Sequence, residues 1–113
     1  MPAFALAHLH TTKNNDDIVE YIDRIQATLD PYQGRFRVHG GTPEVIEGEW
    51  PGTVVIIEFP DVEHARGWYA SPAYQEILPL RLRHLPGSAI IIQGVGPDYD
   101  PRRTAAKLRQ ASG

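Results

Sequence analysis

Side chains that commonly bind ligands gather in one segment, residues 58–81. Trp68, Tyr69 and Tyr74 recur at helical spacing within it, and Arg81 lies near its end. An arginine suits a carboxylate because its planar guanidinium makes two parallel hydrogen bonds. Aromatic residues at this spacing usually fill a core, and that reading is favoured for Trp68. Tyr74 fits a core or a pocket mouth equally well, because a buried hydroxyl needs a partner.

Glu58 is the one charged residue in an otherwise apolar strand, residues 53–59. A carboxylate in such a setting must be paired, solvated or protonated. We expect Arg81 to approach it, and two readings follow. Arg81 anchors an anionic ligand with Glu58 as catalytic acid or base, or the two form a structural ion pair. The ion pair is favoured, since such pairs also perturb charged groups without catalysis.

His39 is the second candidate catalytic residue, because it precedes Gly40 and Gly41, where a bend can aim it into a cleft. Histidine titrates near neutrality and serves as a general base. A solvated strand histidine is the commoner meaning. Glu44 and Glu47 follow the bend and suit an acid–base pair, although solvation of an edge strand is again the commoner meaning.

Metal and cofactor sites are not expected. His8 and His10 share one strand face, but a divalent metal needs three or more convergent ligands, and the chain has no cysteine. The chain contains neither a phosphate-binding P-loop nor a Gly-x-Gly-x-x-Gly motif. Ser71 precedes Pro72, so it is expected to cap a helix and not to act as a nucleophile.

The length of 113 residues predicts one domain, residues 1–95, followed by a short tail, residues 96–113. The N-terminus has no basic region typical of a signal peptide, and no apolar run approaches the length of a membrane span. The absence of cysteine fits a reducing compartment. We therefore expect a cytoplasmic protein with no membrane partner.

Charge divides the chain at the same boundary. Residues 1–95 carry seven Lys/Arg against twelve Asp/Glu, a net of −5, whereas the tail carries four against two, a net of +2. An acidic body disfavours nucleic acid as the partner, because phosphate binding needs a basic face. A nucleic-acid interpretation rests only on the tail cations, Arg102, Arg103, Lys107 and Arg109.

Hydrophobic periodicity predicts the elements that position these residues. Strands are expected at residues 3–11, 35–38, 44–47, 53–59 and 89–93, the second and third being one strand interrupted at the Gly40–Gly41 bend. Helices are expected from Asn14 or Asn15 to about Pro31, from Asp61 to Ser71, and from Pro72 to Leu82. Residues 104–110 form at most a weak helix, in a tail expected to be mobile or docked on a neighbour.

The predicted order is β-α-β-β-α-β, the plan of ferredoxin-like α+β folds. Right-handed crossovers place both helical layers on one sheet face. Strands 3–11 and 53–59 are nevertheless apolar on both faces. A second sheet is the simplest cover for the other face, and a twofold homodimer supplies one. The predicted assembly is a dimeric α+β barrel.

Four segments resemble the small bacterial family called domain of unknown function 1330. They are residues 35–41, 44–50, 55–60 and 65–81, with Trp68 to Gln75 the most specific. The likeness covers about residues 3–95 and implies a ferredoxin-like fold of the dimeric α+β barrel group. It implies no established activity.

Two functions remain open. The first is binding or conversion of a small anionic organic molecule, without a cofactor, in a pocket between sheet and helices. Its expected walls are Trp68, Tyr69, Tyr74 and Phe36, and its expected polar groups are His39, Glu58 and Arg81. Similar barrels include cofactor-independent monooxygenases, an analogy of fold alone. The second is a non-catalytic homodimeric assembly or stress-related module, whose pocket would be filled by side chains.

Overall fold

A computed structural model describes residues 1–11 and 14–112. Thr12 and Lys13 of the predicted domain, and Gly113 of the predicted tail, lie outside the described residues. The elements, in order, are β1 (Ala3–Leu9), α1 (Asp16–Leu29), η1 (Asp30–Tyr32), β2 (Arg35–Gly41), β3 (Thr53–Phe59), α2 (Val62–Ala70), α3 (Pro72–Leu82), β4 (Gly87–Gln93) and α4 (Pro101–Ser112). The α+β class is confirmed.

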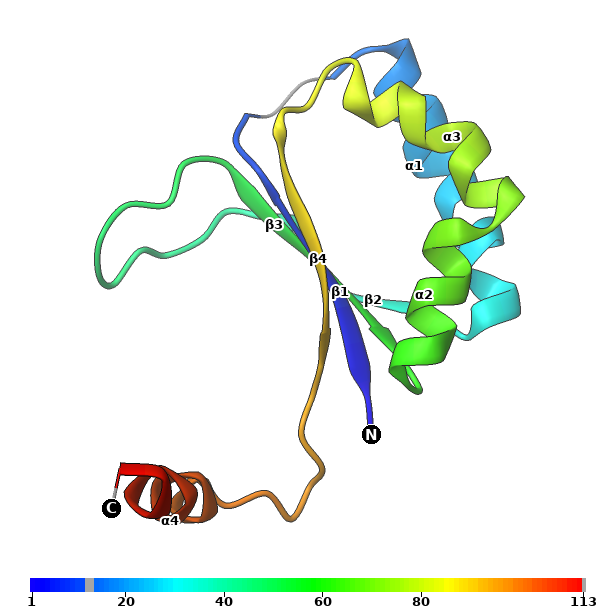
Figure 1. Ribbon diagram of the computed structural model, residues 1–113. Helices are drawn as coiled ribbons and strands as arrows, with labels where there is room; N and C mark the ends of the chain where they lie inside the picture. Colours follow the sequence, from blue (N-terminus) through cyan, green and yellow to red (C-terminus); the bar gives the residue numbers. More distant parts are fainter. Residues whose placement is uncertain (12–13, 113) are drawn as a thin grey trace.

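The four strands form one antiparallel sheet in the order β2-β3-β1-β4. β1 is central and pairs with both β3 and β4, so that Leu6 lies between Ile56 and Ile90. Helices α1, α2 and α3 all lie on one side of the sheet (Figure 1). The sheet is therefore covered by helices on one face only.

Local chemistry explains where the helices begin. The side chain of Asn15 accepts the backbone N–H of Ile18 at 3.0 Å, and Asp61 accepts that of His64 at 2.8 Å. Ser71 separates α2 from α3, and Pro72 follows it at the first helical position. These caps satisfy N–H groups that have no partner inside the helix. The predicted break at Ser71 and the capping role of that residue are both confirmed.

The core lies between the sheet and the three helices. Ile57 and Phe59 point into it from β3, and Leu29 and Ile77 meet them from α1 and α3. Phe59 is only 1% exposed. Gly34 lies so close to Leu29 and Phe59 that an added Cβ would stand 2.7 and 2.8 Å from their side chains. This tight packing fixes the positions of α1 and α3 relative to the sheet.

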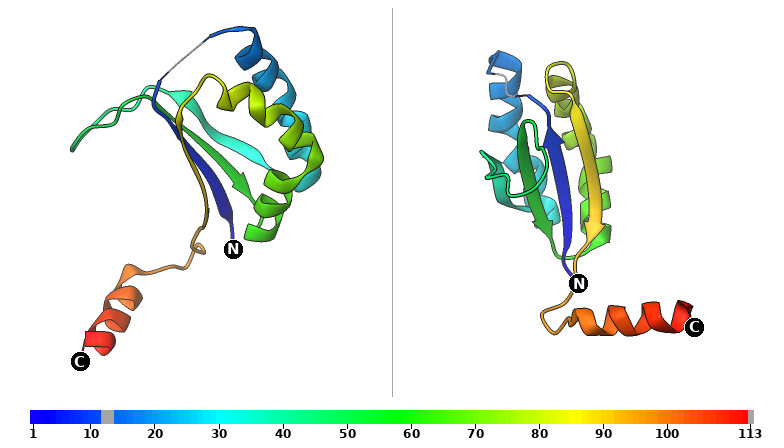
Figure 2. Two further views of the ribbon diagram at one scale, coloured as in Figure 1. Left: turned by 45° about the horizontal axis from the view of Figure 1, so that its top comes forward. Right: turned by 90° about the vertical axis from the view of Figure 1, so that its left-hand side faces the viewer.

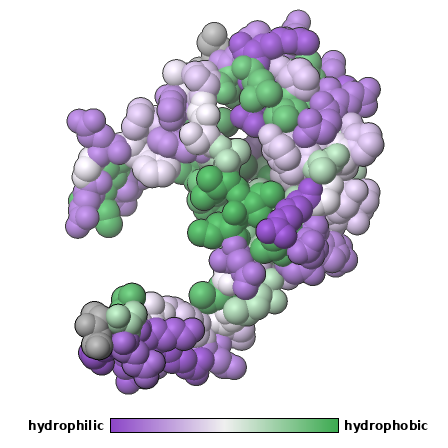
Figure 3. Space-filling model, viewed as in Figure 1, coloured by the Kyte–Doolittle hydropathy of each residue, from purple (hydrophilic) through white to green (hydrophobic). Residues whose placement is uncertain are grey.

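The opposite face, which we call the open face, carries side chains from all four strands, among them Leu6, Val38, Ile56, Ile90 and Ile92. Ile90 and Ile92 are 50% and 53% exposed. Figure 3 shows hydrophobic surface here, facing the space between the 42–52 loop and α4. As expected, the single chain has a sheet with two apolar faces but helices that cover only one of them.

Two predictions about the segment after β2 had different outcomes. The bend is present, since Gly40 has a positive φ of 71° and β2 carries register irregularities after Phe36 and after His39. The strand expected at residues 44–47 was wrong: residues 42–52 form an irregular loop that projects from the sheet (Figures 1 and 2). Three glutamates favour solvent over a sheet edge here.

The tail is more regular than expected. α4 extends over Pro101–Ser112, longer than the weak helix predicted at 104–110. It projects from the end of β4 instead of packing on the body (Figure 2). In the described part of the chain, α4 has no extended contact with another helix or strand.

Candidate functional site

A cavity of about 570 Å³ lies between the sheet and the helices. Aliphatic side chains of the strands form much of its wall. Its aromatic and polar lining includes Tyr21, Phe36, His39, Trp68, Tyr74 and Arg81. A largely apolar cavity with a few convergent polar groups is the usual form of a small-molecule site.

The junction between α2 and α3 sets the positions of two aromatic rings. Ser71 Oγ donates to the carbonyl of Trp68 at 2.7 Å and accepts the backbone N–H of Tyr74 at 3.2 Å. The Trp68 and Tyr74 ring centroids lie 4.1 Å apart as a result. One serine thus holds the end of one helix and the start of the next, and fixes both rings against the cavity.

Trp68 serves the core and the cavity together. Its Nε1 donates to Thr28 Oγ1 at 3.0 Å, and Thr28 Oγ1 donates to the carbonyl of Ile25 at 2.6 Å. Trp68 also packs against Phe59, with centroids 5.5 Å apart. The indole N–H is already bonded inside the protein, so Trp68 offers a ligand an apolar surface. This agrees with the core reading favoured for it.

Tyr74 is paired with a residue that the sequence did not single out. The hydroxyls of Tyr21 and Tyr74 lie 2.8 Å apart, and both rings border the cavity. Burial, and next the neighbouring Tyr74, raise the pKa of Tyr21 well above its ordinary value, so this phenol stays protonated. Tyr21 lies at helical spacing from the buried Ile18 and Ile25 of α1, and its hydroxyl among these apolar residues is the sequence signal that could have pointed to a polar partner.

Arg81 is the positive group of the site. It is only 7% exposed and lines the cavity from the last turn of α3. Burial lowers the pKa of Arg81, but Tyr74 and Tyr21 together raise it by more, so the guanidinium stays charged. Among the described residues, no carboxylate lies within 4.0 Å of it. Arg81 is therefore a buried cation that interacts with two phenols.

Glu58 does not join this group. Its carboxylate accepts from Arg37 Nε at 2.6 Å, so the expected approach to Arg81 is not found. Side chains alternate along a strand, and Ile57 and Phe59 face the helices, so Glu58 points to the open face. The predicted catalytic role is not supported by this position, whereas a structural ion pair is present with a different arginine.

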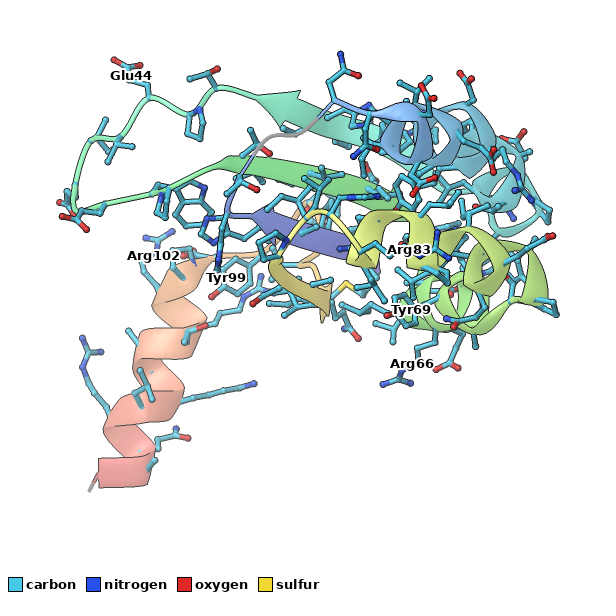
Figure 4. The ribbon with its side chains drawn as sticks, turned by 90° about the horizontal axis from the view of Figure 1, so that it is seen from above. Glu44, Arg66, Tyr69, Arg83, Tyr99 and Arg102 are labelled. Atoms are coloured by element: carbon cyan, nitrogen blue, oxygen red, sulfur yellow. The ribbon has the colours of Figure 1, made fainter. Side chains whose placement is uncertain are left out.

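His39 and Tyr69 lie at the border of the cavity. His39 is exposed and stacks on Phe36, with ring centroids 4.5 Å apart. Tyr69 lies on the helix-bearing side of the sheet, where Figure 4 labels it, and its ring is 5.5 Å from that of Tyr74. The structure therefore gathers Trp68, Tyr69, Tyr74, Arg81 and His39 around one cavity.

Residues 1–11 and 14–112 contain no group of three or more His, Cys, Asp or Glu side chains placed to hold a metal ion. Over the same residues, no helix has the length and apolar character needed to cross a membrane.

Residues 2–95 match the family described as Domain of unknown function (DUF1330). The chain belongs to this family. The match covers the sheet, α1, α2 and α3, and stops before α4. No curated protein matches the chain.

Solved structures share the fold at low sequence identity. A protein of unknown function from Rhodopseudomonas palustris has a TM-score of 0.63 and 17% identity, with 85% of this chain and 84% of that one covered. A dimeric ferredoxin-like protein of unknown function from Jannaschia sp. has a TM-score of 0.64 and 14% identity, covering 85% and 100%. An ethyl tert-butyl ether d (EthD) family protein from Bacillus halodurans has a TM-score of 0.52 and 9% identity, covering 84% and 100%. At these identities the likeness concerns the fold.

Proposed function

We propose that this protein binds a small organic anion in the cavity between sheet and helices. The observation that carries the proposal is Arg81, a buried guanidinium that faces the cavity beside two phenols and has no carboxylate partner among the described residues. A buried charge without a counter-ion is costly, so an anionic ligand would stabilise it.

The chemistry of the walls defines the ligand class. A carboxylate accepts two parallel hydrogen bonds from a guanidinium, and the Tyr21 and Tyr74 hydroxyls can supply a further donor. The apolar remainder of the molecule would pack on Trp68 and the strand aliphatics. A cavity of about 570 Å³ suits a small aromatic or short-chain acid. His39, at the border, is the group we propose for any proton transfer.

The test is a calorimetric screen of small aromatic and short-chain acids, each paired with its neutral amide. We expect an acid to bind and its amide not to. Arg81→Met should weaken binding about 10- to 100-fold, since a hydrogen bond to a charged group contributes about 1.5–3 kcal/mol. Arg83→Met is the matched control, because that exposed arginine lies two positions away and pairs with Asp17 at 3.6 Å.

The outcomes separate the two functions left open by the sequence. Equal binding by both variants would overturn the role of Arg81. No binding by any acid, with the chain still dimeric, would favour the non-catalytic homodimeric module instead.

We also propose that two copies associate through their open faces as a dimeric α+β barrel. The support is the exposed apolar surface of the open face, which includes Val38 of β2 and Ile90 and Ile92 of β4, together with the similar fold of a protein described as dimeric. Sedimentation should give a dimer, and Ile92→Lys should dissociate it because a charge would enter the interface. A wild-type chain that stays monomeric at high micromolar concentration would contradict this.

A further inference from the structure

Two arms extend from the body on the same side, and neither is explained by the cavity. The 42–52 loop begins at the end of the sheet where Leu9 pairs with Thr53, and α4 follows the end where Ala3 pairs with Gln93. These are opposite ends of the sheet. Figures 1 and 2 show both arms on the side of the open face. In Figure 4, Glu44 of the loop and Arg102 of α4 lie on this side.

The loop presents an apolar tip between acids. Val45 and Ile46 lie between Glu44 and Glu47, and Ile46 is 88% exposed. Glu49 follows, and these three glutamates form no ion pair with any described residue. Val45 is 47% exposed as well, so the two side chains form an apolar tip whose burial against a second apolar surface would be favourable.

The base of the loop is fixed. Trp50 stacks on His8 with ring centroids 4.1 Å apart, and His8 Nε2 lies 2.6 Å from the Pro51 carbonyl oxygen. Gly52 has a φ of 87°, and a side chain there would collide with the Leu9 carbonyl. The loop is therefore anchored at one point on the sheet, and its direction away from the body follows from that anchor.

The other arm has the complementary character. α4 carries Arg102, Arg103, Lys107 and Arg109, and its Leu108 is 65% exposed. Arg102 is paired with Asp100 at 2.6 Å, which leaves Arg103 and Lys107 as cations with no ion pair to a described residue. Each arm thus combines an apolar residue with charges of one sign, and the signs are opposite.

We propose that the 42–52 loop of one copy docks on α4 of a second copy, and that this clasp forms at both ends of the dimer. The proposal rests on the open-face dimer proposed above. Ile46 packs near Leu108 of the second copy, and Glu44 and Glu47 lie near its Arg103 and Lys107. For both the loop and α4, the docking partner is a second copy of this chain.

Symmetry and charge select this arrangement. A twofold axis parallel to the strands would bring loop to loop at one end and α4 to α4 at the other. Acid would then face acid, and base would face base. An axis across the strands brings a loop and an α4 together at each end. Like charges held together across an interface are costly, so the second axis is favoured.

Cross-linking tests the contact directly, because the chain has no native cysteine to interfere. Ile46→Cys and Leu108→Cys chains are mixed with a short bismaleimide. We expect a cross-linked dimer from the mixture and little from either variant alone. Efficient cross-linking of Ile46→Cys with itself would show loop against loop. A cross-linked monomer from the doubly substituted chain would show that the clasp closes within one copy. Either result would overturn the proposal.

Charge reversal gives an independent readout, the dimer dissociation constant from sedimentation. Glu44→Lys with Glu47→Lys, and separately Arg103→Glu with Lys107→Glu, should each weaken association roughly tenfold or more. Combining all four substitutions should restore it, because the loop and α4 are again opposite in sign. In the alternative symmetry, each reversal exchanges one pair of like charges for another, so none of the three variants would change the dissociation constant appreciably.

These experiments distinguish a failure of the clasp from a failure of the open-face dimer. If the reversals leave the constant unchanged while Ile92→Lys dissociates the dimer, the clasp is wrong and the open-face dimer stands. If the wild-type chain is monomeric, both are wrong.

Discussion

The two faces of the sheet carry similar aliphatic side chains in different surroundings. On the helix-covered face, Ile57 and Phe59 are buried among α1, α2 and α3. On the open face, Ile90 and Ile92 are about half exposed. Hydrophobicity alone therefore does not determine burial; the connections decide it, because right-handed crossovers place α1, α2 and α3 on one side of the sheet. One face gives the chain its stability, and the other is available to a second copy.

Removing a large side chain from each face is the strongest test of this division. Phe59→Ala deletes a fully buried ring and should lower the free energy of unfolding by about 3–5 kcal/mol at every protein concentration. The measurement is unfolding by urea at two protein concentrations. Because the Phe59 ring contacts Trp68, the fluorescence of that indole in the folded protein should also change in the variant.

Ile92→Ala is the matched variant on the open face. It should cost far less at low concentration, with a larger cost appearing only where the dimer forms. An equal, concentration-independent loss from both variants would show that the open face is covered within one chain.

A second test adds volume to each region. Gly34→Ala would place a methyl group 2.7 Å from Leu29 and 2.8 Å from Phe59, both of which are fully buried. Overpacking of this kind costs about 1–3 kcal/mol. Thermal and urea unfolding would measure it.

Gly41→Ala is its control, because a Cβ there meets no described atom within 4 Å. This variant should be close to neutral. If Gly34→Ala were also neutral, the helix-covered face would be looser than its packing indicates.

The sequence predicted the covered face better than the open side. Alternation along residues 53–59 and the cap at Ser71 follow from local chemistry, and the structure shows both. The 44–47 strand was wrong because Val45 and Ile46 look like strand residues, whereas the bend at Gly40 and the surrounding glutamates direct the chain away from the sheet. α4 was underestimated, since its few apolar residues give no sign of what they contact.

The site was predicted in part for the same reason. Trp68, Tyr74 and Arg81 lie within 14 positions of one another on the consecutive helices α2 and α3, and the predicted cap at Ser71 joins these helices. The Tyr21–Tyr74 contact joins residues 53 positions apart and depends on how α1 packs on α3. The pairing of Glu58 with Arg37 depends on the irregular register between β2 and β3. The hydrophobic periodicity of the sequence gives no information about either contact.

The smallest expected effects come from two aspartates at helix starts, one in the body and one in an arm. Hydrogen bonds from His64 lower the pKa of Asp61, and those from Arg102 lower the pKa of Asp100, both from an ordinary 3.8. A lowered folded-state pKa means that each carboxylate contributes fully above that ordinary value. The contribution is lost as the pH falls through the lowered pKa.

At protein concentrations too low for dimer formation, the readouts should differ because α2 is packed within the chain and α4 is not. Asp61→Asn keeps the cap but should remove part of the acid dependence of global unfolding. Asp100→Asn should leave global unfolding unchanged and alter only the amide signals of α4 near pH 3–4, since a solvated helix of this length is marginal alone. If Asp100→Asn shifted global unfolding as much as Asp61→Asn, α4 would be packed on the body or on a second copy strongly enough to unfold with it. Repeating the measurement at two protein concentrations would show which of these holds α4.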